Sequence, residues 1–353
     1  MNSTENKLKI KDLTRSELQS YIIGLGAKKY RADQIFNWLY NNLSEDFDSM
    51  QNIPKELRQL LNEKSIISTL RKINQDNSTG TLTRKFLFET IDGKKIESVL
   101  IPDNDRNTLC ISTQVGCPLD CKFCATGLMG YTRNLSAGEI LDQYLSTAKE
   151  YGKEKITNIV YMGMGEPLIN YEATEKSLRL LTDEMNEGIT RNRITVSTAG
   201  IPKRIIDLAN TDMRVKLAFS LHSCFEDIRS KIMPINKKYS LAENLKALQY
   251  YANKTKTKIT FEYTMLKGLN DREEDIRALA KLTSQLHSKI NIIPFNSIKH
   301  MDPDGISGEL EPTPLDKIYR FAEKLRERKV TVLIRDTQGD DIAAACGQLA
   351  IKN

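Results

Sequence analysis

The chain has 353 residues, of which 40% are hydrophobic and 28% are charged, a composition typical of globular proteins. It is long enough to bury a full hydrophobic core without cross-links. Its net charge of +6 permits a nucleic-acid partner but does not require one. Because neither an apolar run of membrane-spanning length nor a secretory signal is evident, we expect a cytoplasmic protein with no membrane partner.

Residues 1–75 predict a small helical domain. Thr14 and Glu17 have the spacing of a helix-capping box, and Pro54 is suited to open a later helix. Apolar residues recur at helical spacing around Trp38, the one tryptophan of the chain. We expect Trp38 to pack in the core of this domain rather than to stack on a nucleic-acid base.

Residues 76–105 predict a β-hairpin extension. Two runs that alternate between apolar and polar residues, within 85–102, flank Asp92-Gly93, a strong hairpin-turn signal. The hairpin lies between the helical domain and a longer region of different character.

Residues 106–353 alternate between strand and helix patterns, which indicates a parallel sheet. The expected strands are 109–115, 156–162, 193–198, 215–221, 258–266, 289–295 and 330–335. The expected helices are 137–151, 172–185, 202–210, 241–252, 272–287 and 314–328. Six or so such units are too few for a closed eight-stranded barrel. We therefore expect an α/β fold built on a partial, open (β/α)6 barrel, although the spacing alone does not distinguish it from a doubly wound sheet.

Four of the six cysteines lie within 110–124. Cys117, Cys121 and Cys124 form a C-x3-C-x2-C pattern whose thiolates can converge on one soft metal centre. If the first strand runs straight, Cys110 lies up to about 20 Å from Cys117, too far to close the site. Two interpretations follow: a three-thiolate 4Fe–4S cluster with one open iron, or a structural zinc site. The distant fourth zinc ligand could be Cys224, His222 or Cys346.

The C-x3-C-x2-C loop after the first strand, with Phe123 before the last cysteine, resembles the radical S-adenosylmethionine (SAM) enzymes. This resemblance implies that Cys117, Cys121 and Cys124 hold a 4Fe–4S cluster and that SAM binds its open iron. It also implies a set of SAM contacts at successive strand ends. These are Gly165 and Glu166 in MGMGEP, Ser197 in VSTAG, Ser220, Leu221 and His222 in FSLHS, and Asn296 in INIIPFN.

The segments TLCISTQVGCPLDCKFCATG, MGMGEP, SLH, MPINKKY and DIAAACGQL together resemble the RlmN/Cfr family of radical SAM RNA adenosine methyltransferases. The match is nearer the RlmN branch. It implies that Cys346 carries a methyl group taken from one SAM, that Cys110 resolves the protein–RNA intermediate through a transient disulfide, and that Glu97 accepts a proton. Cys224 has no corresponding role, and Ala343 stands where many relatives carry an acidic residue.

The resemblance also implies the partners. The substrates would be an adenosine of 23S rRNA in the peptidyl transferase centre and the adenosine 3′ of the anticodon in tRNA, both methylated at carbon 2. We expect RNA contacts from the helical N-terminal domain, a one-electron donor such as flavodoxin, and a monomer. Two alternatives stay open: methylation at carbon 8, and a non-catalytic Fe–S or zinc module that binds RNA.

Overall fold

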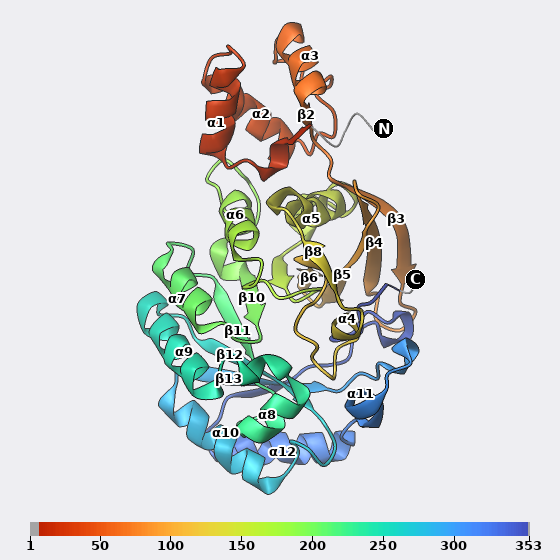
Figure 1. The fold of residues 1–353 in the computed structure, drawn as a ribbon, viewed down its shortest axis with the longest axis vertical. Helices are drawn as coiled ribbons and strands as arrows, with labels where there is room; N and C mark the ends of the chain where they lie inside the picture. The colour runs from red at the N-terminus through yellow and green to blue at the C-terminus, as the bar shows by residue number, and fades with distance from the viewer. Residues whose placement is uncertain (1–6, 352–353) are drawn as a thin grey trace.

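The computed structural model describes residues 7–351, and these form a mixed α/β molecule built on a ten-stranded sheet (Figure 1). The strand order is β14-β13-β12-β11-β10-β9-β6-β5-β4-β3. From β6 to β14 all neighbouring strands pair in parallel, whereas β3, β4, β5 and β6 pair antiparallel. The sheet is therefore a parallel barrel segment extended at one edge by a meander.

The parallel strands and their covering helices confirm the partial barrel. The strands are β6 (Arg106–Cys110), β9 (Asn158–Tyr161), β10 (Ile194–Thr198), β11 (Lys216–Ser220), β12 (Ile259–Met265), β13 (Ser288–Pro294) and β14 (Val332–Ile334). The helices are α5 (Ala137–Tyr151), α6 (Tyr171–Leu181), α7 (Pro202–Asn210), α9 (Leu241–Thr255), α10 (Glu273–Gln285) and α12 (Leu315–Glu327). Since β6 pairs with β5 on its other side and not with β14, the barrel stays open.

The predicted hairpin is present as β4 (Arg84–Thr90) and β5 (Lys95–Asp103), joined through Gly93 at φ +74°. The sequence did not indicate β3 (Leu70–Asn77), which pairs with β4 and forms the outer edge of the sheet. Its residues LRKINQDN are mostly polar, as suits an exposed edge strand that must not aggregate. Because β3 starts at Leu70, the main sheet begins before the expected hairpin segment.

The expected first strand, 109–115, is wrong in extent, because β6 ends at Cys110. The side chain of Gln143 on α5 captures Ser112 instead: its Oε1 accepts from the Ser112 backbone N–H (2.8 Å) and its Nε2 donates to the Ser112 carbonyl (2.9 Å). The chain then enters β7 (Gln114–Gly116), which pairs antiparallel with β8 (Tyr131–Asn134). The straight path assumed for Cys110 to Cys117 does not exist.

Four further elements were not predicted from the sequence, and they are short. They are α4 (Ala125–Leu128), α8 (Glu226–Ile232), α11 (Gly305–Glu309) and the β7–β8 pair. Two of them, α4 and the β7–β8 pair, lie next to the cysteine loop in the chain. Short elements of this kind are fixed by the contacts around them rather than by a periodic sequence pattern.

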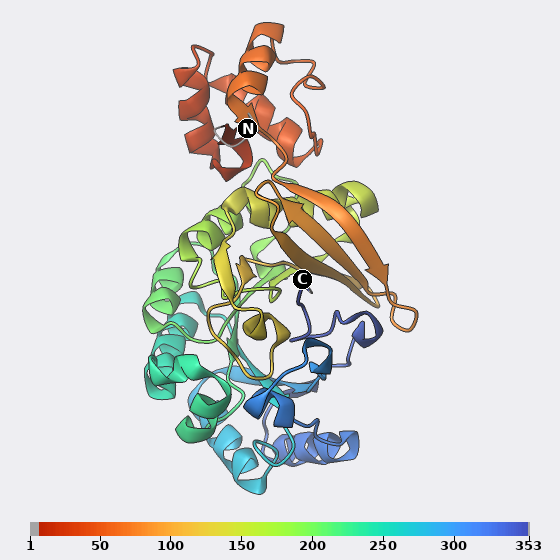
Figure 2. The same cartoon turned by 45° about the vertical axis from the view of Figure 1, so that its right-hand side comes forward.

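The N-terminal helices α1 (Arg15–Gly24), α2 (Tyr30–Tyr40) and α3 (Lys55–Lys64) lie together at one end of the molecule (Figure 2). The capping box of Thr14 and Glu17 is formed. Trp38 packs partly buried against the hydrophobic core, and its Nε1 donates to Asn52 (2.6 Å), which confirms a packing role. The short strands β1 (Leu8–Lys9) and β2 (Ser65–Ile66) pair in parallel.

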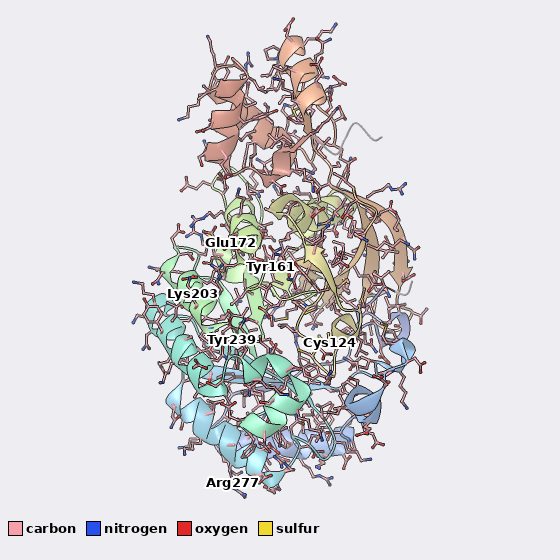
Figure 3. All side chains as sticks on the ribbon, viewed as in Figure 1. Cys124, Tyr161, Glu172, Lys203, Tyr239 and Arg277 are labelled. Atoms are coloured by element: carbon pink, nitrogen blue, oxygen red, sulfur yellow. The ribbon has the colours of Figure 1, made fainter. Side chains whose placement is uncertain are left out.

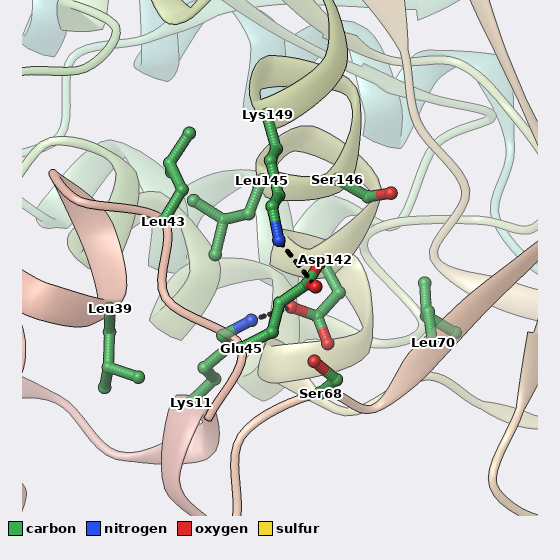
Figure 4. Close-up of a pocket in the computed structure, with 10 residues that line it drawn as sticks. All are labelled: Lys11, Leu39, Leu43, Glu45, Ser68, Leu70, Asp142, Leu145, Ser146 and Lys149. Carbon is green, nitrogen blue, oxygen red and sulfur yellow. Dashed lines mark hydrogen bonds and ion pairs between the residues drawn. The ribbon is translucent and has the colours of Figure 1, made fainter. Parts of the chain in front are cut away.

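A buried ion pair joins this domain to the barrel (Figure 4). Lys11 donates to Asp142 on α5 at 2.5 Å, and both side chains are about 95% buried. The other oxygen of Asp142 accepts from the N–H and the hydroxyl of Thr69, both at 2.6 Å. Within residues 7–351, no helix is long and apolar enough to cross a membrane.

Candidate active site

The three cysteines of the C-x3-C-x2-C pattern lie on the loop between β7 and α4, where Figure 3 labels Cys124. All three are half-buried free thiols. Burial, followed by the charge of its neighbours, raises the pKa of Cys121 well above its usual range, and burial raises the pKa of Cys117 to about 12. Such thiols ionise readily only when a metal centre binds their thiolates.

The loop fits an iron–sulfur cluster better than a single zinc ion. Among residues 7–351, no three His, Cys, Asp or Glu side chains gather closely enough to hold one metal ion. A zinc site needs four ligands at roughly 2.0–2.3 Å from one point. Two of the three distant ligands considered for zinc are otherwise engaged: His222 already accepts a hydrogen bond at Nδ1, and Cys346 lies beside Arg335. Three thiolates without a fourth protein ligand are compatible with an iron–sulfur cluster that keeps one iron open.

The first predicted SAM-binding segment turns at Gly165, whose φ is +99°. A Cβ there would lie 2.5 Å from the Cβ of Gln114, so the turn requires glycine. The buried carboxylate of Glu166 accepts from the N–H groups of Leu168 (3.0 Å) and Ala199 (2.8 Å). Burial raises the pKa of Glu166 to about 6 despite these hydrogen bonds. A carboxylate held in one position, such as that of Glu166, can bind a cationic amine.

The next predicted segment ends β11 and places Ser220, Leu221 and His222 at the rim of the barrel, beside Ser197 at the end of β10. His222 adopts φ +54° and its Nδ1 accepts from the backbone N–H of Thr264 at 2.9 Å. Burial, assisted by the charge of Arg229, lowers the pKa of His222 to about 3. His222 is therefore neutral with its proton on Nε2, and its ring packs 4.5 Å from that of Phe123.

Arg229 on α8 (Glu226–Ile232) organises these strand ends, although no sequence pattern marks it. It is fully buried. Its Nη2 donates to the carbonyls of Ala199 (2.7 Å) and Ser220 (3.0 Å), and its Nε to that of Leu221 (3.1 Å). Asn236 in the MPINKKY segment accepts from Nη1. Burial lowers the pKa of Arg229 to about 10, whereas the nearby Cys121 raises it. One buried cation thus holds two rim segments.

The C-terminal tail is clamped on both sides of Cys346, which is exposed. Asn296, one of the predicted SAM contacts, donates to the Cys346 carbonyl at 3.1 Å. The Gly347 carbonyl accepts from Ala125 (2.7 Å), and the Leu349 carbonyl accepts from the Thr126 hydroxyl (2.6 Å), both on α4. The tail is therefore tied to the helix that follows the cysteine loop.

Ala343 adopts φ +49° at the turn into this tail. This left-handed conformation is unfavourable for a residue with a Cβ. Asp341 anchors the turn by accepting from the N–H of Thr79 at 2.9 Å, from the far end of β3. Ala343, which replaces the acidic residue of many relatives, thus lies at a strained turn. Nothing in the structure indicates a role for an acidic side chain at this position.

Cys110 ends β6, and Cys346 lies in the C-terminal tail beside Arg335. Nη1 of Arg335 lies 3.8 Å from Sγ of Cys346. Cys110 is 8% exposed, and burial together with the charge of Cys346 raises its pKa to about 12. Both are free thiols. Cys224, also a free thiol, is half-buried and its pKa is raised to about 12 by burial.

Glu97 on β5 also reaches the tail. Its Oε2 accepts from the N–H of Ala350 at 3.0 Å, and its Oε1 lies 3.2 Å from Nζ of Lys85. Burial raises the pKa of Glu97, although the ammonium of Lys85 opposes the shift. The carboxylate of Glu97 is thus buried, has a pKa above the ordinary value for glutamate, and lies next to the segment that carries Cys346.

Comparison with known proteins agrees with this arrangement. The profile of the radical SAM superfamily matches residues 111–280, and that of the ribosomal RNA large subunit methyltransferase N-terminal domain matches residues 8–67. A probable dual-specificity RNA methyltransferase RlmN of Thermotoga neapolitana is 45% identical over 97% of both chains. That of Salinibacter ruber is 41% identical over 99% of this chain and 96% of its own. The chain belongs to the RlmN family of radical SAM RNA methyltransferases.

A solved structure of the same kind supports the fold. A radical SAM methyltransferase from Sphaerobacter thermophilus superimposes with a TM-score of 0.90 at 40% identity, covering 97% of this chain and 99% of the other. Membership of the RlmN family makes the chain an enzyme whose cofactors are a 4Fe–4S cluster and SAM. The alternative of a non-catalytic RNA-binding module is therefore wrong.

Proposed function

We propose that the enzyme methylates carbon 2 of adenosine in two RNAs, 23S rRNA at the peptidyl transferase centre and tRNA just 3′ of the anticodon. The observation that carries this proposal is that two of the three free thiols outside the cysteine loop are exposed Cys346, whose sulfur lies 3.8 Å from Nη1 of Arg335, and buried Cys110. Carbon 2 of adenine is electrophilic and has no lone pair, so it cannot attack the methyl group of SAM directly. A thiol that carries the methyl group and a second thiol that releases the product provide another route.

Cys117, Cys121 and Cys124 would hold the cluster, which together with SAM supplies a 5′-deoxyadenosyl radical. The fixed carboxylate of Glu166 is suited to receive the amino group of SAM, and the neutral ring of His222, whose Nδ1 accepts from Thr264, would offer the N–H at Nε2. The remaining proposed contacts at the rim are Gly165, Ser197, Ser220, Leu221 and Asn296.

Cys346 would act as the methyl carrier. Its thiolate attacks the methyl carbon of one SAM, S-adenosylhomocysteine leaves, and the sulfur becomes an S-methyl thioether. After a hydrogen atom is taken from that methyl group, the carbon adds to the adenine ring and links protein to RNA. The clamped tail keeps this sulfur exposed while both of its flanks stay fixed.

Cys110 and Glu97 would complete the turnover. The radical adduct loses one electron, which the cluster would take up, and Glu97 takes the proton that leaves the ring, a role that its buried carboxylate fits. Cys110, as thiolate, then attacks Sγ of Cys346, so that a transient disulfide forms and the methylated base leaves. In this proposal residues 106–353 are the catalytic unit and 76–105 carry the base.

The N-terminal domain is the segment that we expect to bind the RNA substrates. Residues 8–67 match a domain described for ribosomal RNA methyltransferases, and we propose that the segment 1–75 binds RNA. RNA bases that are unpaired or splayed out are the accessible targets for such chemistry. We further propose a monomer in the cytoplasm that receives single electrons from a donor such as flavodoxin.

The test is nucleoside analysis of RNA from cells that lack the enzyme and carry either the wild-type chain or a variant. We expect 2-methyladenosine in 23S rRNA and tRNA with the wild type and with the matched control Cys224→Ala, and none with Cys346→Ala. The appearance of 8-methyladenosine instead would assign carbon 8, and the absence of both would overturn the proposal. A methyl group on the Cys346 peptide, seen by mass spectrometry, would confirm the carrier.

A further inference from the structure

Cys346 occupies a β-turn that residues on both sides of it hold in place. The backbone N–H of Gln348 donates to the Ala345 carbonyl at 3.0 Å, which makes Cys346 and Gly347 the two central residues of the turn. Gly347 takes φ +84°, whereas Cys346 keeps a negative φ, which is the pattern of a type II turn. The exposed thiol therefore stands at the tip of a turn that needs glycine as its next residue.

This turn lies directly against the cysteine loop. A Cβ built on Gly347 would lie 3.1 Å from the carbonyl oxygen of Phe123 and 4.0 Å from the Cα of Cys124. The next residue of that loop, Ala125, donates its N–H to the Gly347 carbonyl at 2.7 Å. A small shift of the turn would therefore change where the sulfur of Cys346 lies relative to the loop.

The side chain of Gln348 closes the same turn a second time. It is 4% exposed, and both ends of its amide are hydrogen-bonded. Its Oε1 accepts from the backbone N–H of Ala345 at 3.2 Å. Its Nε2 donates to Oδ1 of Asp340 at 2.7 Å and to the carbonyl of Ser297 at 3.0 Å. A buried amide that is bonded at both ends fixes the orientation of the turn more firmly than one backbone bond does.

The two acceptors of the Gln348 amide group belong to segments that are anchored elsewhere. Ser297 lies just beyond the end of β13. Asp340 begins a short 3-10 helix, Asp340–Ile342, in which Asp341 accepts from the N–H of Thr79 at 2.9 Å. Thr79 lies between β3 and β4. Gln348 thus ties the turn to the end of one barrel strand and, through this short helix, to the connection between β3 and β4.

We propose that Gln348 is a positioning residue that holds the sulfur of Cys346, and the methyl group on it, where the methyl carbon can reach the adenine ring. This inference rests on the proposed function. Reacting atoms must approach to within about 3–3.5 Å in a productive arrangement. A turn held by its backbone bond alone would leave the sulfur a wider range of positions. Loosening Gln348 should therefore slow the transfer without weakening RNA binding.

The first test compares steady-state kinetics of full-length, cofactor-loaded wild type, Gln348→Ala and Gln348→Glu on a 23S rRNA transcript. The Ala variant loses every hydrogen bond of the amide. The Glu variant keeps the acceptor for Ala345 but places two carboxylates within hydrogen-bonding distance at Asp340. We expect kcat to fall about 100-fold in both, the size of a slightly misplaced reacting group, with KM for RNA little changed.

Gln249→Ala is the matched control, because it removes an exposed amide that bonds to Asn253 on α9, and it should keep the wild-type kcat. Thermal melting identifies any variant that fails to fold.

A reversed pair separates positioning from a general loss of stability. Adding Asp340→Asn to Gln348→Glu restores the contact with donor and acceptor exchanged, because the new amide group can donate to the new carboxylate. We expect the double variant to recover kcat about tenfold over Gln348→Glu, the size of one regained hydrogen bond. Asp340→Asn alone keeps an acceptor oxygen for Gln348 and should cost less than Gln348→Glu.

A second readout does not depend on the reaction. Hydrogen–deuterium exchange of the peptide that spans 345–348 is measured on protein purified without its cofactors. Since the Ala345 N–H loses its acceptor in Gln348→Ala, we expect its exchange to speed up about tenfold, with no change in Gln249→Ala.

An unchanged exchange rate or an unchanged kcat in Gln348→Ala, with the wild type active, would overturn this inference and leave the proposed function standing. So would a double variant no more active than Gln348→Glu. A wild-type enzyme that forms no methyladenosine would instead overturn the proposed function, and this inference with it.

Discussion

The carboxylate of Glu97 accepts a hydrogen bond from the backbone N–H of Ala350, which is 253 residues away in the chain. This contact joins strand β5 of the hairpin to the tail just after Cys346. The proposed base and the proposed methyl carrier are thereby held in one rigid unit. In the proposed function, the hairpin would thus be part of the active site as well as an extension of the sheet.

Replacing Glu97 by Gln should separate the two roles of the side chain. The amide oxygen still accepts from Ala350, so the fold should be kept, but no proton can be taken. We expect 2-methyladenosine formation to fall about 100-fold or more, the size of a lost general base. Single-turnover assays with nucleoside analysis measure this. Glu89→Gln, on β4 and paired with Arg71 at the surface, is the control and should retain activity.

The pH dependence should also report Glu97. The reaction needs the carboxylate, so activity should fall as pH falls through the pKa of Glu97, which burial raises above its ordinary value. Lys85 lowers that pKa, so Lys85→Met should move the acidic limb of the pH–rate profile to still higher pH. A limb that stays in place in Lys85→Met would show that another group controls it.

Removal of the resolving thiol should trap the intermediate. In Cys110→Ala, Cys346 can still take up a methyl group and couple to RNA, but no thiolate can release the product. We expect a covalent protein–RNA adduct through Cys346, visible as a shifted band that nuclease collapses. Wild type and the double variant Cys110→Ala/Cys346→Ala should show none. A Cys110→Ala protein with an intact cluster and no adduct would contradict the resolving role.

Arg229→Met should destabilise the fold and the rim. Three buried carbonyl groups, those of Ala199, Ser220 and Leu221, would lose their donor. At about 1–3 kcal/mol for each unsatisfied group, partly relieved by relaxation, we expect the free energy of unfolding to fall by about 3–5 kcal/mol. Denaturant unfolding measures it. The control Arg320→Met, which removes an exposed pair with Asp316, should cost less than about 1 kcal/mol.

Asp142→Asn should loosen the N-terminal domain from the barrel. It leaves the buried ammonium of Lys11 without a counter-charge, which costs about 3–5 kcal/mol when a buried pair is broken on one side. We expect faster proteolytic cleavage between α3 and β3 and a lower melting temperature. Lys149→Met, which breaks the exposed pair with Glu45 in the same pocket, should change neither measurably. Equal effects in both variants would argue against a special role for the buried pair.

The sequence by itself determined the features that depend on neighbouring residues. The predicted capping box of Thr14 and Glu17 is formed, and Ser136–Glu139 and Ser240–Glu243, which have the same spacing in the sequence, form two more, because each needs only a partner three residues on. The Asp92-Gly93 turn and the periodic strands and helices of the barrel follow from the same short-range physics. The family-specific cysteine segments were sufficient to identify the RlmN family.

Tertiary structure alone decided the contacts that join distant segments. No local pattern marks Arg229, Arg335 or Gln143, whose sequence contexts are those of ordinary polar residues. Gln143 ends the first strand early because its amide replaces the strand partner of Ser112. Arg229 and Arg335 become functional candidates only where folding removes them from water and surrounds them with carbonyls or thiols. Long-range burial sets such roles, and spacing along the chain does not encode it.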